Sequence, residues 1–518
     1  MTSNRNSRGG HRGAVSGAVA ALACAGLVAS PLFAQNVPAP RGQNAPRPAP
    51  TPAPVPMASP SPVVQPIPGD AAPTARQAIP LPVLTPRQAA QMTDLLRTER
   101  VAQGLQRIDE EYPIPTDNDG LVRAILDYAH AVHSGRLAPE DFQADWGLRP
   151  AAYDPLPEFA AAAAQDRLAQ WFAALPPPYA GYEGLKDELA TYRTIAANGG
   201  WKTLAAGPDL KLGSTGARVV ALRERLAVED ASVVTTGASF DADLEEAVKR
   251  VQRRYGLNPS GLVSAQTLAA LNVPVADRVR QIMANMERWR WLPRELPTTR
   301  IQVNVAAAVM AVFEGDRPVF SMRAVTGRPG NETPMLVSAI HSVVLNPPWN
   351  VPSGIAAKEL WPKGAAYLKR NGYKVIGTGA NRRLQQQAGP QSALGRYKFD
   401  FDNPYAVYLH DTPSQATFSR FDRLASHGCV RLEKPGALAV LLLKDDPNWT
   451  QEAIQAAVDT GVTQRVPLPN KVAVFLLYWT AYASSDGGMN FRSDPYGWDK
   501  KLAQKIEARA AIQARAGK

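Results

Sequence analysis

The stretch "YAVYLHDTPSQATFSRFDRLASHGCVRLEKPG" (residues 405–436) decides how this chain is interpreted. It opens as a short apolar strand that ends at His410, continues as a polar loop, and reaches Cys429 between His-Gly and Val-Arg. The chain has only two cysteines, and Cys429 is either a reactive thiol or a buried, inert side chain. The rest of the sequence decides between these two interpretations.

Residues 1–34 are typical of an export signal. Basic residues without any acidic residue precede the apolar run "AVSGAVAALACAGLVASPLFA". Cleavage after Ala34 and an uncleaved anchor both stay open, because the position three before that cut is Leu32. The second cysteine, Cys24, lies in this run, so if the signal is cleaved the mature protein carries one cysteine and forms no internal disulfide in an oxidising compartment. We therefore expect a periplasmic protein.

A proline-rich segment follows the signal. Residues 35–86 hold 16 of the 46 prolines and few large apolar side chains, which predicts a semi-rigid, extended linker. The remaining stretch of about 430 residues is too long for one core and predicts two or three domains. The net charge of +11 suits a polyanionic envelope, and no basic block with interleaved aromatic residues indicates nucleic acid as a partner.

Residues 87–205 are predicted to form a helical scaffold. The runs "RQAAQMTDLLRTERVAQGLQRI", "DGLVRAILDYAHAVHSGRL" and "GYEGLKDELATYRTIAANGGW" place apolar residues at three-and-four spacing and break at Gly or Pro. His130 and His133 lie three apart in one of these helices with no third ligand in view. We therefore predict no metal site, and nothing in the sequence calls for a cofactor.

Residues 206–275 are predicted as a separate three-helix unit. Two amphipathic helices and a third short helix are separated by Gly-marked turns, with Leu244, Ala247 and Val251 on one face of the second. The ordered spacing resembles the small peptidoglycan-binding domain of cell-wall enzymes, while a generic helical bundle is the alternative. One departure is Arg223, which stands where many members of that family have glutamine.

After a linking helix at residues 276–298 the composition becomes typical of strands. The runs "TRIQVNVAAAVMAVFEG", "RPVFSMRAVTG", "SAIHSVVLNP" and "YAVYLHDTP" are apolar or alternating, and "KVAVFLLYWTAYASSDGGMNF" predicts two strands around a turn. We predict a β-sandwich or barrel-like catalytic domain over residues 299–500, with a long, irregular capping insertion at about 350–390. Residues 501–518 are predicted as a C-terminal helix or tail. The predicted fold class is multidomain α+β, with helical units followed by a mostly-β domain.

Thiol catalysis needs a base, a site for the oxyanion and an exposed nucleophile. His410 is the candidate base for Cys429, and a backbone carbonyl is expected to orient it, since adjacent strand side chains such as Asp411 point to opposite faces. Successive N–H groups near the thiol are the candidate oxyanion site. The residues assigned to the oxyanion site and to loop support are Ser426, His427, Gly428 and Arg431.

These motifs resemble the L,D-transpeptidase (YkuD) family. "HDTP" at 410–413 followed by "SHGCVRLE" at 426–433 is similar to its catalytic pattern, and "NPPWNVP" at 346–352 and "ALGRYKF" at 393–399 resemble the larger YcbB-type subgroup. The resemblance covers roughly residues 90–500. It implies Cys429 as nucleophile and His410 as base. The residues assigned with it to substrate binding are Trp349, Asn350 and Tyr408.

The resemblance also implies a reaction. Cys429 would attack the carbonyl at the L-centre of the third residue of a stem tetrapeptide, typically diaminopimelate, and D-alanine would leave. An amine of a neighbouring stem would then resolve the acyl-enzyme to a 3-3 cross-link. Water as acceptor would make the protein an L,D-carboxypeptidase, and a protein amine would give covalent anchoring to the wall. Peptidoglycan stem peptides and other wall-synthesis enzymes are the implied partners, and carbapenems the implied inhibitors.

Two other classes stay open. The helical segment and the three-helix unit also suit a noncatalytic wall-binding scaffold, which would need neither the thiol nor the histidine. An NlpC-type thiol endopeptidase would use both groups, but there the cysteine usually precedes the histidine. In this chain His410 precedes Cys429.

Overall fold

The computed structural model describes residues 80–106, 112–484 and 488–516. The predicted signal and almost all of the predicted linker, through residue 79, lie outside these ranges. Among the described residues, none of the helices combines the length and the apolar character that crossing a membrane requires.

The first described segment is helical. Helix α1 (Pro86–Ala102) starts at a capping box in which the Gln88 N–H donates to the Thr85 hydroxyl and the Gln88 side chain accepts from the Thr85 N–H (3.0 Å). The other helices here are α2 (Asn118–Ser134), η1 (Pro139–Asp141), α3 (Leu156–Ala164), α4 (Leu168–Ala173) and α5 (Ala180–Ala197). Their apolar stripes are buried, and in α2 the stripe is formed by Leu121, Ile125, Tyr128 and Val132.

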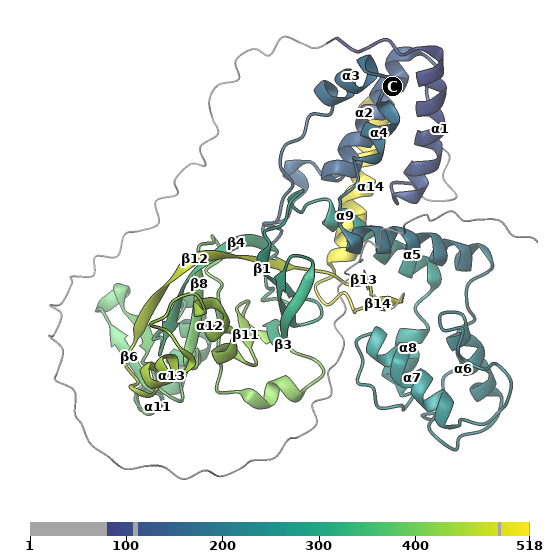
Figure 1. Cartoon of the computed structure of the whole chain (residues 1–518). Helices are drawn as coiled ribbons and strands as arrows, with labels where there is room; N and C mark the ends of the chain where they lie inside the picture. The colour runs from purple at the N-terminus through teal and green to yellow at the C-terminus, as the bar shows by residue number, and fades with distance from the viewer. Residues whose placement is uncertain (1–79, 107–111, 485–487, 517–518) are drawn as a thin grey trace, which may run out of the picture. The chain divides into compact units, whose positions relative to one another are not determined.

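The three-helix unit consists of α6 (Ala217–Ala227), α7 (Ala242–Arg254) and α8 (Ala265–Leu271), which Figure 1 shows as one group. Arg223 is buried in α6, and its guanidinium donates to the carbonyls of Val234 (3.0 Å) and Ser239 (2.9 Å). The residue that departs from the family pattern therefore ties the loop between α6 and α7 to the first helix. The buried apolar faces comprise Val219, Leu222 and Leu226 of α6 and Leu244, Ala247 and Val251 of α7.

A nine-stranded sheet forms the framework of the second half of the chain. Its order is β10-β3-β11-β9-β8-β4-β12-β1-β2, and β3 also pairs with β2, so the sheet closes on itself as a barrel-like layer. Figure 1 shows its strands in green to yellow, with late strands such as β12 beside early ones such as β1. The strands are β1 (Thr299–Asn304), β2 (Val309–Glu314), β3 (Arg317–Gly327), β4 (Leu336–Leu345), β8 (Tyr397–Phe401), β9 (Leu409–His410), β10 (Leu424–Ser426), β11 (Val430–Leu432) and β12 (Gln464–Leu477). Two helices accompany the sheet, α12 (Pro435–Leu443) and α13 (Gln451–Asp459).

The run at residues 299–315 differs from the prediction of a single strand. It forms the antiparallel pair β1 and β2, with a turn between Asn304 and Val309 in which Ala308 has φ 50°. An uninterrupted apolar run hides this turn, because no Gly, Pro, Asn or Asp marks it beyond Asn304.

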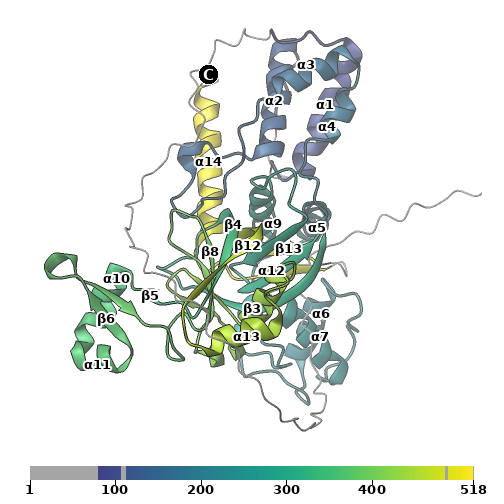
Figure 2. The same ribbon diagram turned by 60° about the vertical axis from the view of Figure 1, so that its left-hand side comes forward.

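The capping insertion also differs from the prediction, because it is not irregular. Residues 349–390, called the cap below, contain the sheet β5-β7-β6 and several short helices, which Figure 2 shows grouped together. The cap buries a small core of its own, made of Val351, Ala356, Leu360, Leu368 and Leu384. Its elements are β5 (Trp349–Asn350), α10 (Ser353–Ile355), η2 (Ala356–Leu360), η3 (Trp361–Lys363), α11 (Gly364–Arg370), β6 (Tyr373–Ile376), η4 (Gly379–Asn381) and β7 (Arg383–Gln386). Each element is shorter than the window over which a sequence period becomes visible.

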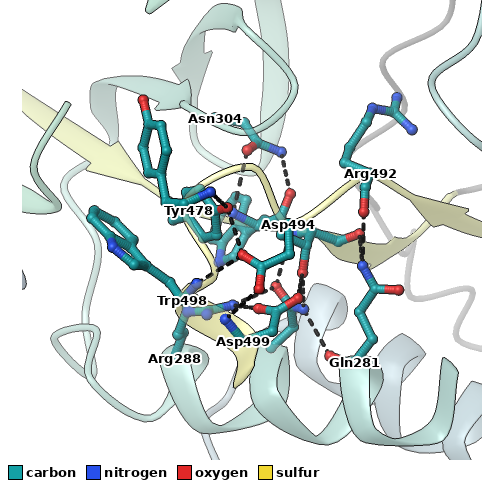
Figure 3. Close-up of polar contacts among 12 residues, drawn as sticks. Gln281, Arg288, Asn304, Tyr478, Arg492, Asp494, Trp498 and Asp499 are labelled. Carbon is teal, nitrogen blue, oxygen red and sulfur yellow. Dashed lines mark hydrogen bonds and ion pairs between the residues drawn. The ribbon is translucent and has the colours of Figure 1, made fainter. Parts of the chain in front are cut away.

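The remaining elements meet at a buried polar cluster, shown in Figure 3. The Arg288 guanidinium lies 2.6 Å from Asp499 Oδ1, and the Thr480 hydroxyl donates to Asp499 Oδ2 (2.7 Å) and accepts from the Asn285 amide (2.8 Å). These contacts join α9 (Val275–Trp289) to the segment after β12 and to α14 (Trp498–Ala516). Strands β13 (Ala481–Ala483) and β14 (Met489–Phe491) pair between them.

We expect Arg288→Leu to destabilise the protein strongly. The Arg288 side chain is 1% exposed and that of Asp499 14%, so the substitution would leave a buried carboxylate without its cation, which costs about 3–5 kcal/mol. The matched control is Arg97→Leu, because Arg97 and Asp94 form an exposed pair expected to contribute less than about 1 kcal/mol. Urea unfolding of both variants measures the difference, and equal midpoints would contradict the assigned role of the cluster.

Candidate active site

The sheet brings Cys429 and His410 together. Strands β9 and β11 run parallel, with Val430 opposite Leu409, and the Val430 N–H donates to the Tyr408 carbonyl (3.1 Å). Cys429 directly precedes β11, so its backbone lies beside Tyr408, two positions before His410. With neighbouring strands about 4.8 Å apart and a rise of about 3.3 Å per residue, the Cα atoms of Cys429 and His410 lie roughly 8 Å apart. Because residues two positions apart along a strand share a face, both side chains lie on the same face of the sheet.

The turn before the nucleophile is held by Ser426. Its hydroxyl donates to the Cys429 carbonyl (2.6 Å) and accepts from the Gly428 N–H (3.1 Å). Gly428 has φ 115°, a left-handed conformation that favours glycine. We predicted that successive N–H groups here form the oxyanion site, but the Gly428 N–H is engaged with Ser426. The Cys429 N–H is therefore the better candidate donor.

Two opposing influences act on the thiol. Burial raises the pKa of the Cys429 thiol above its ordinary value, while hydrogen bonds from Tyr408 oppose that rise. The positive charges of Lys398 and Arg431 also lower the pKa of Cys429. Burial is the largest of these effects, so the thiol is protonated at neutral pH. Reaction then requires a base.

His410 has the properties of that base. The ring is buried, and Nδ1 lies 2.5 Å from the Asp411 carbonyl oxygen, so Nδ1 carries the proton and Nε2 is left as the acceptor. The expected backbone orienter is thus confirmed, whereas the Asp411 carboxylate accepts from the backbone N–H of Arg396 (2.7 Å). Burial, followed by the charge of Arg431, lowers the pKa of His410 to about 3. The imidazole is therefore neutral across the physiological range.

His427 points to the cap. Its Nε2 lies 2.7 Å from Glu359 Oε1 and 3.4 Å from the Arg328 guanidinium. Because a carboxylate only accepts, Nε2 donates to Glu359. His427 therefore joins the catalytic turn to the η2 segment of the cap, a role in loop support.

The contact between His427 and Glu359 leads to a prediction about the mobility of the cap. We expect residues 350–390 to exchange backbone hydrogens faster than the sheet, and Glu359→Ala to increase that exchange about 2- to 5-fold, as losing roughly 0.5–1 kcal/mol of a partly exposed contact would. The matched control is Glu314→Ala, because Glu314 forms a surface pair with Lys444 (3.1 Å) away from the cap. Full protection of the cap in the unmodified protein would contradict its predicted mobility.

The three residues assigned to substrate binding, Trp349, Asn350 and Tyr408, make different contacts. Tyr408 hydrogen-bonds to the Cys429 thiol and to the Trp349 side chain, so strand β5 of the cap reaches the nucleophile through an aromatic pair. The Asn350 side chain accepts from Gln385 (2.9 Å) inside the cap sheet. The described side-chain hydrogen bond of Asn350 therefore stays within the cap, whereas those of Tyr408 and Trp349 lie beside the nucleophile.

Lys398 is a site residue that we did not predict. Its ammonium lies 4.3 Å from the centre of the Tyr408 ring and 2.6 Å from Asp400 Oδ1. The signal that could have revealed it is the alternation in "YKFDF" (397–401), which places a lysine and an aspartate on one face of an otherwise apolar strand. Lys398 supplies positive charge beside the phenol that contacts the thiol.

No group of three or more His, Cys, Asp or Glu side chains suited to a metal occurs in the described ranges. His133, which we considered as a ligand with His130, stacks on Tyr153 at 3.6 Å between ring centres. Burial lowers its pKa to about 4.

Three family models match parts of the chain. Residues 298–449 match the model described as "L,D-transpeptidase catalytic domain" (YkuD), residues 120–189 match "Scaffold domain", and residues 215–271 match "Putative peptidoglycan binding domain". The chain therefore carries an L,D-transpeptidase catalytic domain and a peptidoglycan-binding domain, which confirms the resemblance and the predicted fold class. The YcbB-type subgroup and the individual domain boundaries stay predictions.

One curated relative and several solved structures are similar to this chain. A protein of Haemophilus influenzae named "Putative L,D-transpeptidase" is 31% identical over 243 residues, covering 43% of this chain and 49% of that protein. The chain thus spans about half the length of this curated relative. Similar solved structures include an L,D-transpeptidase of Stackebrandtia nassauensis, at 14% identity and a TM-score of 0.22, covering 52% of this chain and 97% of that one. Another is an L,D-transpeptidase fragment of Xylanimonas cellulosilytica, at 17% identity and a TM-score of 0.16, covering 53% and 99%.

Proposed function

We propose that this protein is an L,D-transpeptidase that forms 3-3 cross-links in peptidoglycan through an acyl-enzyme on Cys429. The observation that carries the proposal is a protonated thiol directly before β11 and a neutral, carbonyl-oriented imidazole at the end of the neighbouring parallel strand β9, two positions apart in register. A pair of this kind stores a proton on sulfur and an acceptor on nitrogen until a substrate arrives. We also propose that the protein works in the periplasm, reached through the N-terminal signal.

The reaction consists of two acyl transfers. In the first, the Cys429 sulfur bonds to the carbonyl carbon at the L-centre of the third stem residue while the thiol proton passes to His410 Nε2. The carbon–nitrogen bond to D-alanine then breaks, and His410 returns the proton to the departing amine. In the second, an amine of a neighbouring stem attacks the thioester, loses a proton to His410, and regenerates the thiol. The Cys429 N–H would stabilise the oxyanion in both steps.

Other acceptors define the alternatives. Water in place of the stem amine would make the enzyme an L,D-carboxypeptidase, and an amine on a protein would attach that protein to the wall. A noncatalytic wall-binding scaffold would leave the thiol unused. We further propose stem peptides as the substrate, with the peptidoglycan-binding domain holding the polymer near the site.

The proposal is tested by incubating the purified protein with disaccharide-tetrapeptide fragments and analysing the products by mass spectrometry. We expect a cross-linked dimer that has lost one D-alanine. A tripeptide alone would indicate the carboxypeptidase, and unchanged tetrapeptide would contradict acyl transfer altogether.

A further inference from the structure

The loop between β3 and β4, residues 328–335, packs directly on the turn that carries the nucleophile. A Cβ atom on Gly327 would lie 2.1 Å from the Asn331 carbonyl oxygen, and one on Gly428 would lie 3.3 Å from the Glu332 carbonyl oxygen. Backbone therefore contacts backbone at both glycines.

Thr333 lies at the centre of this contact. It is fully buried, and its hydroxyl donates to the Gly428 carbonyl (2.7 Å) and accepts from the Gly327 N–H (2.8 Å). One hydroxyl thus connects the end of β3 to the residue before Cys429. Valine has the same shape and can do neither, whereas serine keeps both bonds.

The bond to Gly428 fixes the orientation of one peptide unit. The C=O and N–H of a planar trans peptide point in opposite directions, so a Gly428 carbonyl aimed at Thr333 aims the Cys429 N–H away from it. The preceding N–H, of Gly428, is held by Ser426 (3.1 Å). Thr333 therefore determines where the candidate oxyanion donor points.

Thr333 is itself supported from two distant parts of the chain. The Tyr496 hydroxyl donates to the Gly327 carbonyl (2.6 Å) and accepts from the Thr333 N–H (3.3 Å). Two residues beyond Thr333, the Met335 N–H donates to the Asp145 carbonyl (2.9 Å) in the helical segment. Tyr496 and Asp145 both lie outside residues 298–449, the part that matches the catalytic-domain model.

We propose that Thr333 is a positioning residue for acyl transfer, which acts by orienting the Gly428–Cys429 peptide so that the Cys429 N–H faces the oxyanion. Tyr496 keeps Thr333 in place. This inference rests on the proposed function, because an oxyanion forms only if Cys429 attacks a carbonyl.

The test compares two reactions of the same thiol in the full-length protein. Acylation by a carbapenem passes through an oxyanion, whereas alkylation by iodoacetamide displaces iodide and does not. We expect Thr333→Val to lower the acylation rate and the kcat of stem-peptide transfer roughly 10- to 100-fold, with KM little changed. Alkylation should stay within about threefold of the unmodified protein, an allowance well below the loss expected for a misplaced catalytic group. Thr333→Ser should restore acylation.

Thr480→Val is the matched control. Thr480 is equally buried and its hydroxyl also makes two hydrogen bonds, to Asp499 (2.7 Å) and from Asn285 (2.8 Å), but it does not contact the turn. We expect this variant to lose thermal stability without a selective loss of acylation.

Equal losses of acylation and alkylation in Thr333→Val, or normal acylation, would overturn the inference. An unmodified protein that alkylates but neither acylates nor transfers would overturn the proposed function, and the inference with it.

Discussion

Replacing Cys429 with alanine is expected to abolish acyl transfer and to prevent modification by carbapenems. A carbapenem presents a strained amide that a thiol opens without losing a leaving group, so intact mass spectrometry of the unmodified protein should show one added inhibitor molecule. Digestion should map it to the peptide containing "LASHGCVR" (424–431). Since no neighbouring group can replace the sulfur, the transfer rate should fall by about four orders of magnitude or more.

The chain offers two internal checks on this expectation. It contains no Ser-x-x-Lys and no Lys-Thr-Gly motif, so the serine machinery of penicillin-binding proteins is missing from the sequence. Its other cysteine, Cys24, serves as the matched control, because Cys24→Ala should keep both transfer and the adduct in a preparation that retains residue 24. An adduct that persists in Cys429→Ala would show that another nucleophile is acylated.

Local patterns predicted the helical units well. In α7 the residues at three-and-four spacing, Leu244, Ala247 and Val251, are buried as expected. The strand predicted to end at His410 is shorter than expected, since β9 comprises only Leu409–His410, and its parallel pairing with β11 was not predicted. The burial of a helix face depends on neighbours along one helix, so a short window of sequence contains that information.

Long-range contacts could not be predicted in this way. The bond from Thr333 to Gly428 spans 95 positions, and that between Thr333 and Tyr496 spans 163. A threonine in a loop carries no local signal for either partner. The cap is a similar case, because its core combines single apolar residues from several short elements.

Replacing His410 with glutamine is expected to lower the rate of acyl transfer by roughly 10²- to 10⁴-fold at neutral pH. Glutamine keeps much of the size and polarity of histidine but cannot accept the thiol proton. His427→Ala should retain most of the activity, because His427 contacts Glu359 in the cap (2.7 Å). The matched control is His133→Gln, since His133 is also a histidine whose pKa burial lowers, to about 4, but it lies in the helical segment. Equal losses in the His427 and His410 variants would show that the base is assigned wrongly.

The pH dependence of the two reactions distinguishes a neutral thiol–imidazole pair from a thiolate–imidazolium pair. Burial lowers the pKa of His410 to about 3 and raises the pKa of Cys429, so both groups are neutral between these limits and the transfer rate should be flat from about pH 5 to 8. Alkylation by iodoacetamide requires the thiolate, so its rate should rise about tenfold per pH unit through this range, without a plateau. In His410→Gln, transfer should acquire the same slope, because only the thiolate fraction can then attack. A preformed thiolate–imidazolium pair would instead give an alkylation plateau between about pH 5 and 7, and that result would contradict a neutral pair.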